Sequence, residues 1–136
     1  MWGENLAYTL TQVAHNFGAV AVLGGAFFVS WPASRLEHGR AFAWLIIVGW
    51  GTQIASGVLF GVTSLHYYGA TPDLNDIALA ALAVKVTAAV TGLLLAAIYL
   101  LRGAQWSRAG VLRLFRGLAA LAAIALTAAA FLRWFS

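Results

Sequence analysis

The sequence lacks cysteine, is almost without methionine and has few charged residues. None of its 136 residues is a cysteine, and the single methionine is Met1. The first absence excludes disulfides, thiolate metal sites and thiol catalysis, and the second removes thioether ligands from the interior. Charged residues make up 9% of the chain and hydrophobic residues 62%, whereas a soluble domain carries about 25% charged residues. A chain this apolar cannot cover a soluble surface, so we expect an integral membrane protein.

What the sequence does contain is four long apolar stretches. About 20 apolar residues suffice to cross a hydrocarbon core of roughly 30 Å at 1.5 Å rise per residue. The clearest stretch, 77–102, holds one charge, Lys85, before its final arginine. We therefore predict an all-α, up-down bundle of four transmembrane helices in the lipid bilayer, which forms one domain over residues 1–136. The predicted spans are about 6–31, 42–67, 77–102 and 112–135.

The arginines predict the orientation of the bundle. The connections after the first and third spans hold six of them, whereas the opposite side has Arg133 alone. Because cytoplasmic loops carry an excess of Lys and Arg, we expect both termini and the 66–76 connection to face the periplasm of a bacterial inner membrane, or an equivalent outer compartment. The six arginines are Arg35, Arg40, Arg102, Arg108, Arg113 and Arg116.

Two ionisable side chains, His15 and Lys85, fall deep inside predicted spans. His15 lies roughly 13 Å from the outer end of the first span, and Lys85 roughly 12 Å from that of the third. A cofactor plane along the membrane normal needs ligands from two helices at one depth, so this pair is the candidate axial pair for haem b. His66 differs from His15 by roughly 10 Å in depth, which argues against a simple bis-histidine haem.

Structural roles for the same two residues stay open at this point. Lys85 has a long stem whose ammonium can reach toward the headgroups, and His15 can be a neutral histidine bonded to a carbonyl or to Gln12. Gln12 and Asn16 are the other polar groups of the first span.

A second candidate site lies at the outer surface. His66 with Asp73 or Asp76 offers imidazole and carboxylate ligands for copper or another metal ion. The alternative is that the His-Tyr-Tyr-Gly stretch at 66–69 forms part of an interfacial aromatic belt. We also expect Asp76 to cap the third span, because a carboxylate there accepts free backbone N–H groups.

Small residues predict where helices pack closely. Glycines let helix backbones approach one another in lipid, so the glycine-bearing faces of the first two spans are expected to pack on neighbours, either within the bundle or in another subunit. The positions are Gly18, Gly24, Gly25 and the GxxxG pair Gly57 and Gly61.

The first three spans show a family resemblance. The segment AHNFGAVAVLGGAFFVSWP at 14–32, the stretch from Arg40 to Gly57, and Lys85 in the third span resemble the first three helices of CopD-like membrane proteins. This resemblance implies copper handling across the inner membrane. Val22-Leu23 stand where the family usually has a tryptophan. The architecture is also similar to the four-helix membrane protoporphyrinogen oxidases, haem-b proteins whose first-helix histidine and third-helix lysine would correspond to His15 and Lys85.

Three functional classes follow. The chain is a haem-b-binding redox protein, a transporter of copper or another metal ion, or an accessory subunit of a larger membrane complex or a homo-oligomer. The first and third are compatible. We expect no catalytic activity of its own, because no paired carboxylates and no Ser/His/Asp set lie inside the spans. Nucleic-acid binding is excluded because no basic surface is available outside the headgroup zone.

Overall fold

The computed structural model describes residues 1–31 and 36–135 and contains four long helices, α1 to α4. All four are long and apolar enough to cross a membrane, which confirms the predicted four-helix architecture. No strand occurs in these described ranges. Arg35, which we assigned to the connection after the first span, lies outside the described residues. The helices are α1 Trp2–Ser30, α2 Gly39–Tyr68, α3 Asp76–Arg102 and α4 Arg108–Phe135, with short 3₁₀ helices η1 Leu36–His38 and η2 Gly103–Gln105 before α2 and α4.

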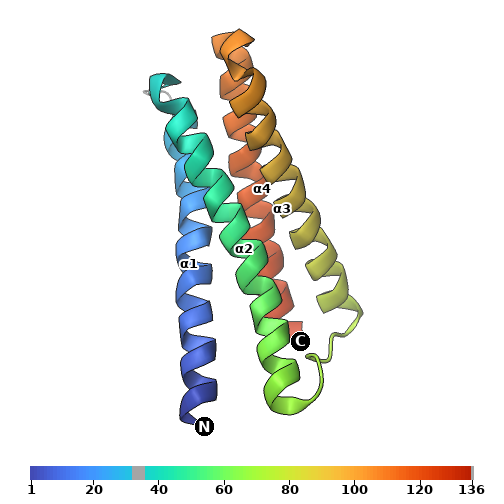
Figure 1. Cartoon of the computed structure of the whole chain (residues 1–136). Coiled ribbons are helices and arrows are strands. Elements are labelled where there is room, and N and C mark those ends of the chain that lie inside the picture. The colour runs from blue at the N-terminus through green and yellow to red at the C-terminus, as the bar shows by residue number, and fades with distance from the viewer. Residues whose placement is uncertain (32–35, 136) are drawn as a thin grey trace.

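The helices run up and down in a ring. α1 packs against α2 and α4, and α3 packs against the same two neighbours. Both chain termini lie at one end of the bundle, together with the 69–75 connection between α2 and α3 (Figure 1). We call this end the terminal end. At the opposite end, the guanidinium of Arg40 donates a hydrogen bond of 2.8 Å to the carbonyl of Leu100 and so satisfies a backbone acceptor in the last turn of α3.

Turn chemistry at the terminal end sets where α2 stops and α3 starts. Gly69 ends α2 with a φ of 69°, and its N–H bonds the carbonyl of Leu65 at 3.0 Å, an arrangement that glycine tolerates best. Asn75 caps α3, because its side-chain oxygen accepts from the Ala78 N–H at 2.9 Å. Our expectation that Asp76 is the cap was therefore wrong by one residue. Asp76 is the first residue of α3, where its charge still faces the positive end of the helix dipole.

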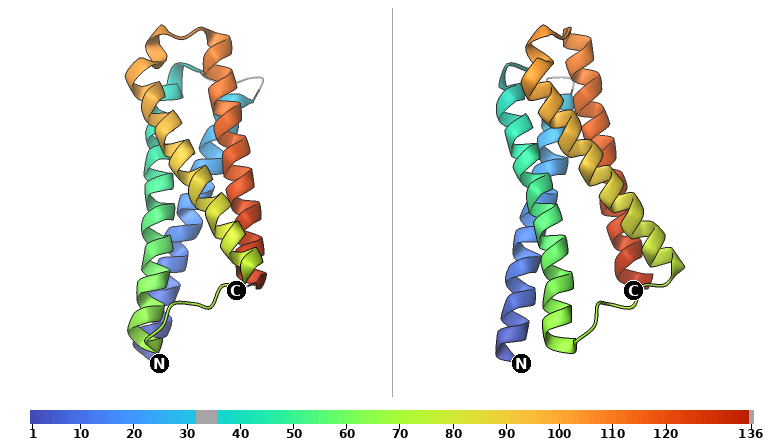
Figure 2. Two further views of the ribbon diagram at one scale, coloured as in Figure 1. Left: turned by 90° about the vertical axis from the view of Figure 1, so that its right-hand side faces the viewer. Right: turned by 45° about the vertical axis from the view of Figure 1, so that its right-hand side comes forward.

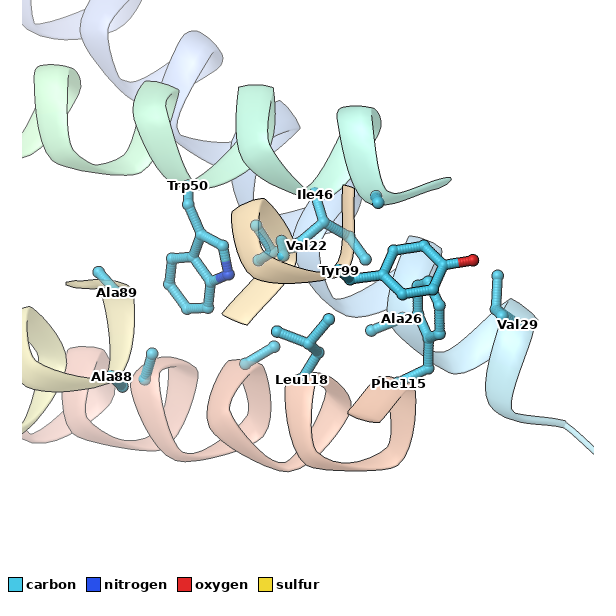
Figure 3. Close-up of a cluster of buried hydrophobic side chains, with 14 of the residues drawn as sticks. Val22, Ala26, Val29, Ile46, Trp50, Ala88, Ala89, Tyr99, Phe115 and Leu118 are labelled. Atoms are coloured by element: carbon cyan, nitrogen blue, oxygen red, sulfur yellow. The ribbon is translucent and has the colours of Figure 1, made fainter. Parts of the chain in front are cut away.

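The apolar core fills the half of the bundle away from the terminal end. Its largest fully buried side chains are Trp50, Phe115, Ile46, Leu118, Val22 and Val29. Figure 3 shows them coming from α1, α2 and α4, with Tyr99 of α3 beside them. The core cluster shared by the four helices comes from 22–29 of α1, 43–50 of α2, 88–99 of α3 and 111–125 of α4, whereas Ala78 and Ala81 of α3 and Ala128 of α4 are buried outside this cluster. The shared apolar core thus stops at the layer of Trp50.

Trp50 of α2 and Gly92 of α3 are in tight contact. A Cβ built on Gly92 would lie 2.5 Å from Trp50 Nε1, so only glycine leaves room for the indole. The indole N–H is fully buried and has no hydrogen-bond partner among the described atoms. Shape, and not hydrogen bonding, therefore fixes this contact.

Beyond the Trp50 layer, the helices separate into two pairs. Figure 2 shows α1 beside α2 and α3 beside α4, with the two pairs diverging toward the terminal end. The 69–75 connection, which has no helix or strand, spans the space between them. The polar residues that the sequence places inside the spans lie in this diverging half.

Candidate functional site

His15 of α1 and Lys85 of α3 are in direct contact. Lys85 Nζ lies 3.1 Å from His15 Nε2, and both side chains are half-buried. The fold therefore brings together the two residues that the sequence placed at one depth, while their depth in a membrane stays a prediction. The Lys85 ammonium is in contact with His15, and the alternative of a lysine that reaches outward to the headgroups stays untested.

A chain of hydrogen bonds holds His15 in one orientation. An ammonium has donors only, so Lys85 donates to Nε2 and the ring proton resides on Nδ1. Nδ1–H then donates to Ser56 Oγ at 2.6 Å, and the Ser56 hydroxyl donates to the carbonyl of Thr52 at 2.5 Å. The partner of His15 is thus Ser56 of α2. It is not Gln12, which donates to Asn16 Oδ1 at 2.7 Å instead.

Gln53 lies one turn before Ser56 on α2. Its buried side-chain amide donates to the backbone carbonyl of His15 and so holds the turn of α1 that carries His15. We call His15, Gln53, Ser56 and Lys85 the polar layer. Ring contacts add to it, since Phe60 meets the edge of the His15 imidazole at 5.7 Å between centroids and stacks on Tyr8.

Lys85 has no carboxylate to pair with among residues 1–31 and 36–135. The four acidic residues are Glu4, Glu37, Asp73 and Asp76, all outside the middle of the helices. Over residues 1–31 and 36–135 the only salt bridge is the one between His38 and Glu37 at 3.6 Å. An intramembrane lysine without a counter-charge needs water, a hydrogen-bond acceptor or a ligand. Among the side chains described, His15 is its hydrogen-bond partner.

The side of α2 that faces Lys85 is left uncovered. Positions seven residues apart share one side of a helix, so Gly57 lies on the same side of α2 as Trp50, and Lys85 on the same side of α3 as Gly92. Trp50 meets Gly92, which makes Gly57 and Lys85 the corresponding pair one layer nearer the terminal end. A Cβ built on Gly57 or Gly61 meets no described atom within 4 Å. The polar layer is therefore bordered by an open glycine face, formed by Gly57 and Gly61.

The predicted packing glycines divide into two groups. Gly18 and Gly25 pack tightly on α2, because an added Cβ would lie 3.1 Å from the Gly49 carbonyl oxygen and 3.3 Å from Ile46, respectively. Gly24, Gly57 and Gly61 have open space around them within the described chain. Their packing against another molecule stays a prediction.

The second candidate site at the terminal end is not assembled. His66 packs edge-on against the ring of Tyr67 at 4.9 Å, Asp73 lies in the connection and Asp76 begins α3. Residues 1–31 and 36–135 contain no group of three or more His, Cys, Asp or Glu side chains that could hold a metal ion. A metal site at His66, Asp73 and Asp76 stays a prediction without structural support.

Ser56 and Thr52 are the members of the site that sequence reasoning did not single out. Serine and threonine are common in membrane helices, where they bond to the carbonyl four residues earlier, as Thr52 does to Val48 at 2.8 Å. The one available signal is that Ser56 follows Gln53 by three residues, on the same side of α2.

The chain was compared with protein-family models, with curated proteins and with solved structures, and no match was found in any of the three. The resemblance to CopD-like proteins and to membrane protoporphyrinogen oxidases therefore stays a prediction.

The donor set of the polar layer can be tested against haem b. Imidazole and amine nitrogens both bind iron, and they come from two helices on either side of an open glycine face. Lys85 Nζ lies 3.1 Å from His15 Nε2, and the flexible four-carbon stem of Lys85 lets its nitrogen shift. His15 and Lys85 would be the residues that hold the iron, with Lys85 bound as the neutral amine, because an ammonium has no lone pair. In donor chemistry the residues present fit the group.

Proposed function

We propose that this chain is a small membrane subunit that binds one haem b and passes electrons within a larger redox or respiratory assembly. The observation that carries the proposal is the meeting of His15 and Lys85, at 3.1 Å, beside the uncovered glycine face of α2. Intramembrane ionisable residues are costly and are retained where they function. This pair consists of two nitrogen donors on different helices.

Each residue of the polar layer has a part in this proposal. His15 and Lys85 hold the iron, Ser56 orients the imidazole through Nδ1, and Gln53 anchors the turn of α1 that carries it. Gly57 and Gly61 leave room for a flat ring against α2. When bound, a haem supplies one-electron oxidation and reduction. The protein side chains supply binding, orientation and a site between helices.

The second candidate function is transport of copper or another metal ion, as the CopD resemblance implies. One observation favours it, because a nitrogen pair 3.1 Å apart also suits two neighbouring ligands of one small ion. A third ligand is lacking in the described part of the chain, which holds no cluster of three such groups. The haem proposal uses more of the arrangement, including the glycine face, so we prefer it.

For location, we propose the inner membrane of a bacterium, with the terminal end on the periplasmic side. Among the described residues, five arginines belong to the opposite end of the bundle (Arg40, Arg102, Arg108, Arg113 and Arg116) and Arg133 alone to the terminal end, which supports this orientation under the positive-inside rule. The polar layer would then lie in the outer half of the membrane.

A reduced-minus-oxidised absorption spectrum tests the proposal. Protein purified in mild detergent should show a Soret band and an α band at close to one haem per chain. Copper content, measured on the same sample by elemental analysis, separates the second candidate. A sample with neither haem nor copper, under conditions in which partner subunits stay bound, would remove both and leave a structural role in the assembly.

A further inference from the structure

The described structure leaves one set of polar side chains on α1 without a role in the polar layer. Asn5, Thr9, Gln12 and Asn16 are all exposed, although α1 is apolar enough to cross a membrane. Their spacing of four, three and four residues places them on one side of the helix. We call this set the α1 stripe.

The α1 stripe points away from α2. Successive residues of a helix are turned by about 100°, so Asn16 and Thr9 lie nearly opposite Gly18 and Thr11, which are two residues further along. Gly18 is packed on α2, and Thr11 is buried. The stripe therefore occupies the outer side of the bundle, where a membrane would surround it.

Hydrogen-bonding capacity on this stripe is not used up. Gln12 donates one hydrogen bond to Asn16 Oδ1 at 2.7 Å. Its carbonyl oxygen and second N–H, and the N–H₂ group of Asn16, have no side-chain or backbone partner in the described ranges. Unpaired amides in hydrocarbon are costly, and such groups in membrane helices commonly bond across to another helix. A helix that covers the α1 stripe would satisfy them.

We propose that the α1 stripe is the interface of a homodimer, in which α1 of one copy packs on α1 of a second copy. All copies of one chain insert in the same orientation, so a two-fold axis along the membrane normal makes the two α1 helices parallel. Each residue then faces its own counterpart. Carboxamides are both donors and acceptors, so Gln12 and Asn16 are complementary to themselves. Asn5 and Gln12, and likewise Thr9 and Asn16, are seven residues apart, the repeat of a left-handed helix pair.

The absence of native cysteine allows a direct test by disulfide cross-linking in native membranes. Val20→Cys introduces a probe one turn beyond Asn16 on the same side of α1 without changing the amides. Leu94→Cys is the matched control, because Val20 and Leu94 are both exposed apolar residues that lie 18 positions after the first residue of their helix, Trp2 and Asp76. Two versions of the chain that carry tags of different mass are co-expressed, so that a homodimer gives a mixed band.

The proposal predicts at least tenfold more cross-linked homodimer from Val20→Cys than from Leu94→Cys. Adding Gln12→Leu and Asn16→Leu to Val20→Cys should weaken self-association about tenfold, while helix content stays unchanged by circular dichroism. A cross-link from Val20→Cys to a different polypeptide, or none, would overturn the proposal. The result is independent of haem, since Val20→Cys and the His15→Ala, Val20→Cys double variant should cross-link equally.

Discussion

Ser56 is the residue that decides how the His15 imidazole is oriented. Its hydroxyl accepts from Nδ1 and so leaves Nε2 directed at Lys85. Groups that orient a metal-binding histidine typically change metal affinity by 10- to 100-fold when removed. We expect Ser56→Ala to weaken haem binding by about tenfold, measured by titrating haem into protein prepared without it.

Ser64→Ala is the matched control for Ser56→Ala. Ser64 is a buried serine of the same helix, and its hydroxyl bonds the carbonyl of Ala70 at 3.0 Å, away from His15. It should leave haem affinity within twofold of the wild type. Equal losses in the two variants would mean that helix stability, and not orientation of His15, is affected.

The depths of His15 and Lys85 could be predicted from sequence, but their neighbours could not. Rise per residue along a helix is constant, so counting from the helix ends placed the two side chains at one level. Rotation about the helix axis was not predictable, because no polar stripe marks the side of α2 or α3 that faces the bundle, and the polar stripe of α1 lies on its outer side. The contacts of Ser56 and Gln53 with His15 depend on that rotation.

Gly92 is a position at which α3 packs tightly on α2, against Trp50. A methyl group there would lie 2.5 Å from Trp50 Nε1, so Gly92→Ala forces the indole or the helices apart. Overpacking of this kind costs about 1–3 kcal/mol. We expect thermal unfolding in detergent to occur at lower temperature for Gly92→Ala, whereas Gly117→Ala, whose added Cβ meets no described atom within 4 Å, should unfold like the wild type.

Gly57 is expected to matter for the cofactor and not for stability. Its side of α2 is open within the described chain, so a larger side chain is accommodated in the protein alone but occupies the space assigned to the ring. Gly57→Leu should keep the helical circular dichroism signal and lose most of the bound haem. Gly51→Leu, at another open glycine of the same helix, should retain haem. Full haem binding by Gly57→Leu would contradict the assignment of this face.

Helix existence and approximate bounds could be predicted, while the packing role of single glycines could not. Long apolar runs interrupted by arginines, glycines and an asparagine mark the four helices, and the predicted ends differ from the observed ones by at most four residues. Of the glycines expected to pack closely, Gly18 and Gly25 do so within this chain, whereas Gly24, Gly57 and Gly61 do not, and Gly92 packs closely without having been predicted. Gly57 and Gly61 lie where the two helix pairs diverge, which leaves them without neighbours in this chain. The divergence of the pairs depends on how residues distant in sequence pack around Trp50.

The orientation that we propose for the bundle in the membrane rests on the positive-inside rule. Thr71 lies in the connection at the terminal end, and Ser107 directly precedes α4 at the opposite end. Single cysteines at these positions can be labelled with a membrane-impermeant maleimide in intact cells. We expect Thr71→Cys to be labelled and Ser107→Cys to react only after the cells are opened. The reverse pattern would place the polar layer in the cytoplasmic half of the membrane.

The central claim is that His15 and Lys85, and no other ionisable pair, hold a haem b between the helix pairs. The measurement that tests it most directly is the reduced-minus-oxidised spectrum of the wild type beside His15→Ala, Lys85→Ala and His66→Ala at equal protein concentration. We predict about one haem per chain in the wild type and in His66→Ala, almost none in His15→Ala, and an altered or lost spectrum in Lys85→Ala. Haem retained unchanged in His15→Ala, or absent from all four proteins, would contradict the account.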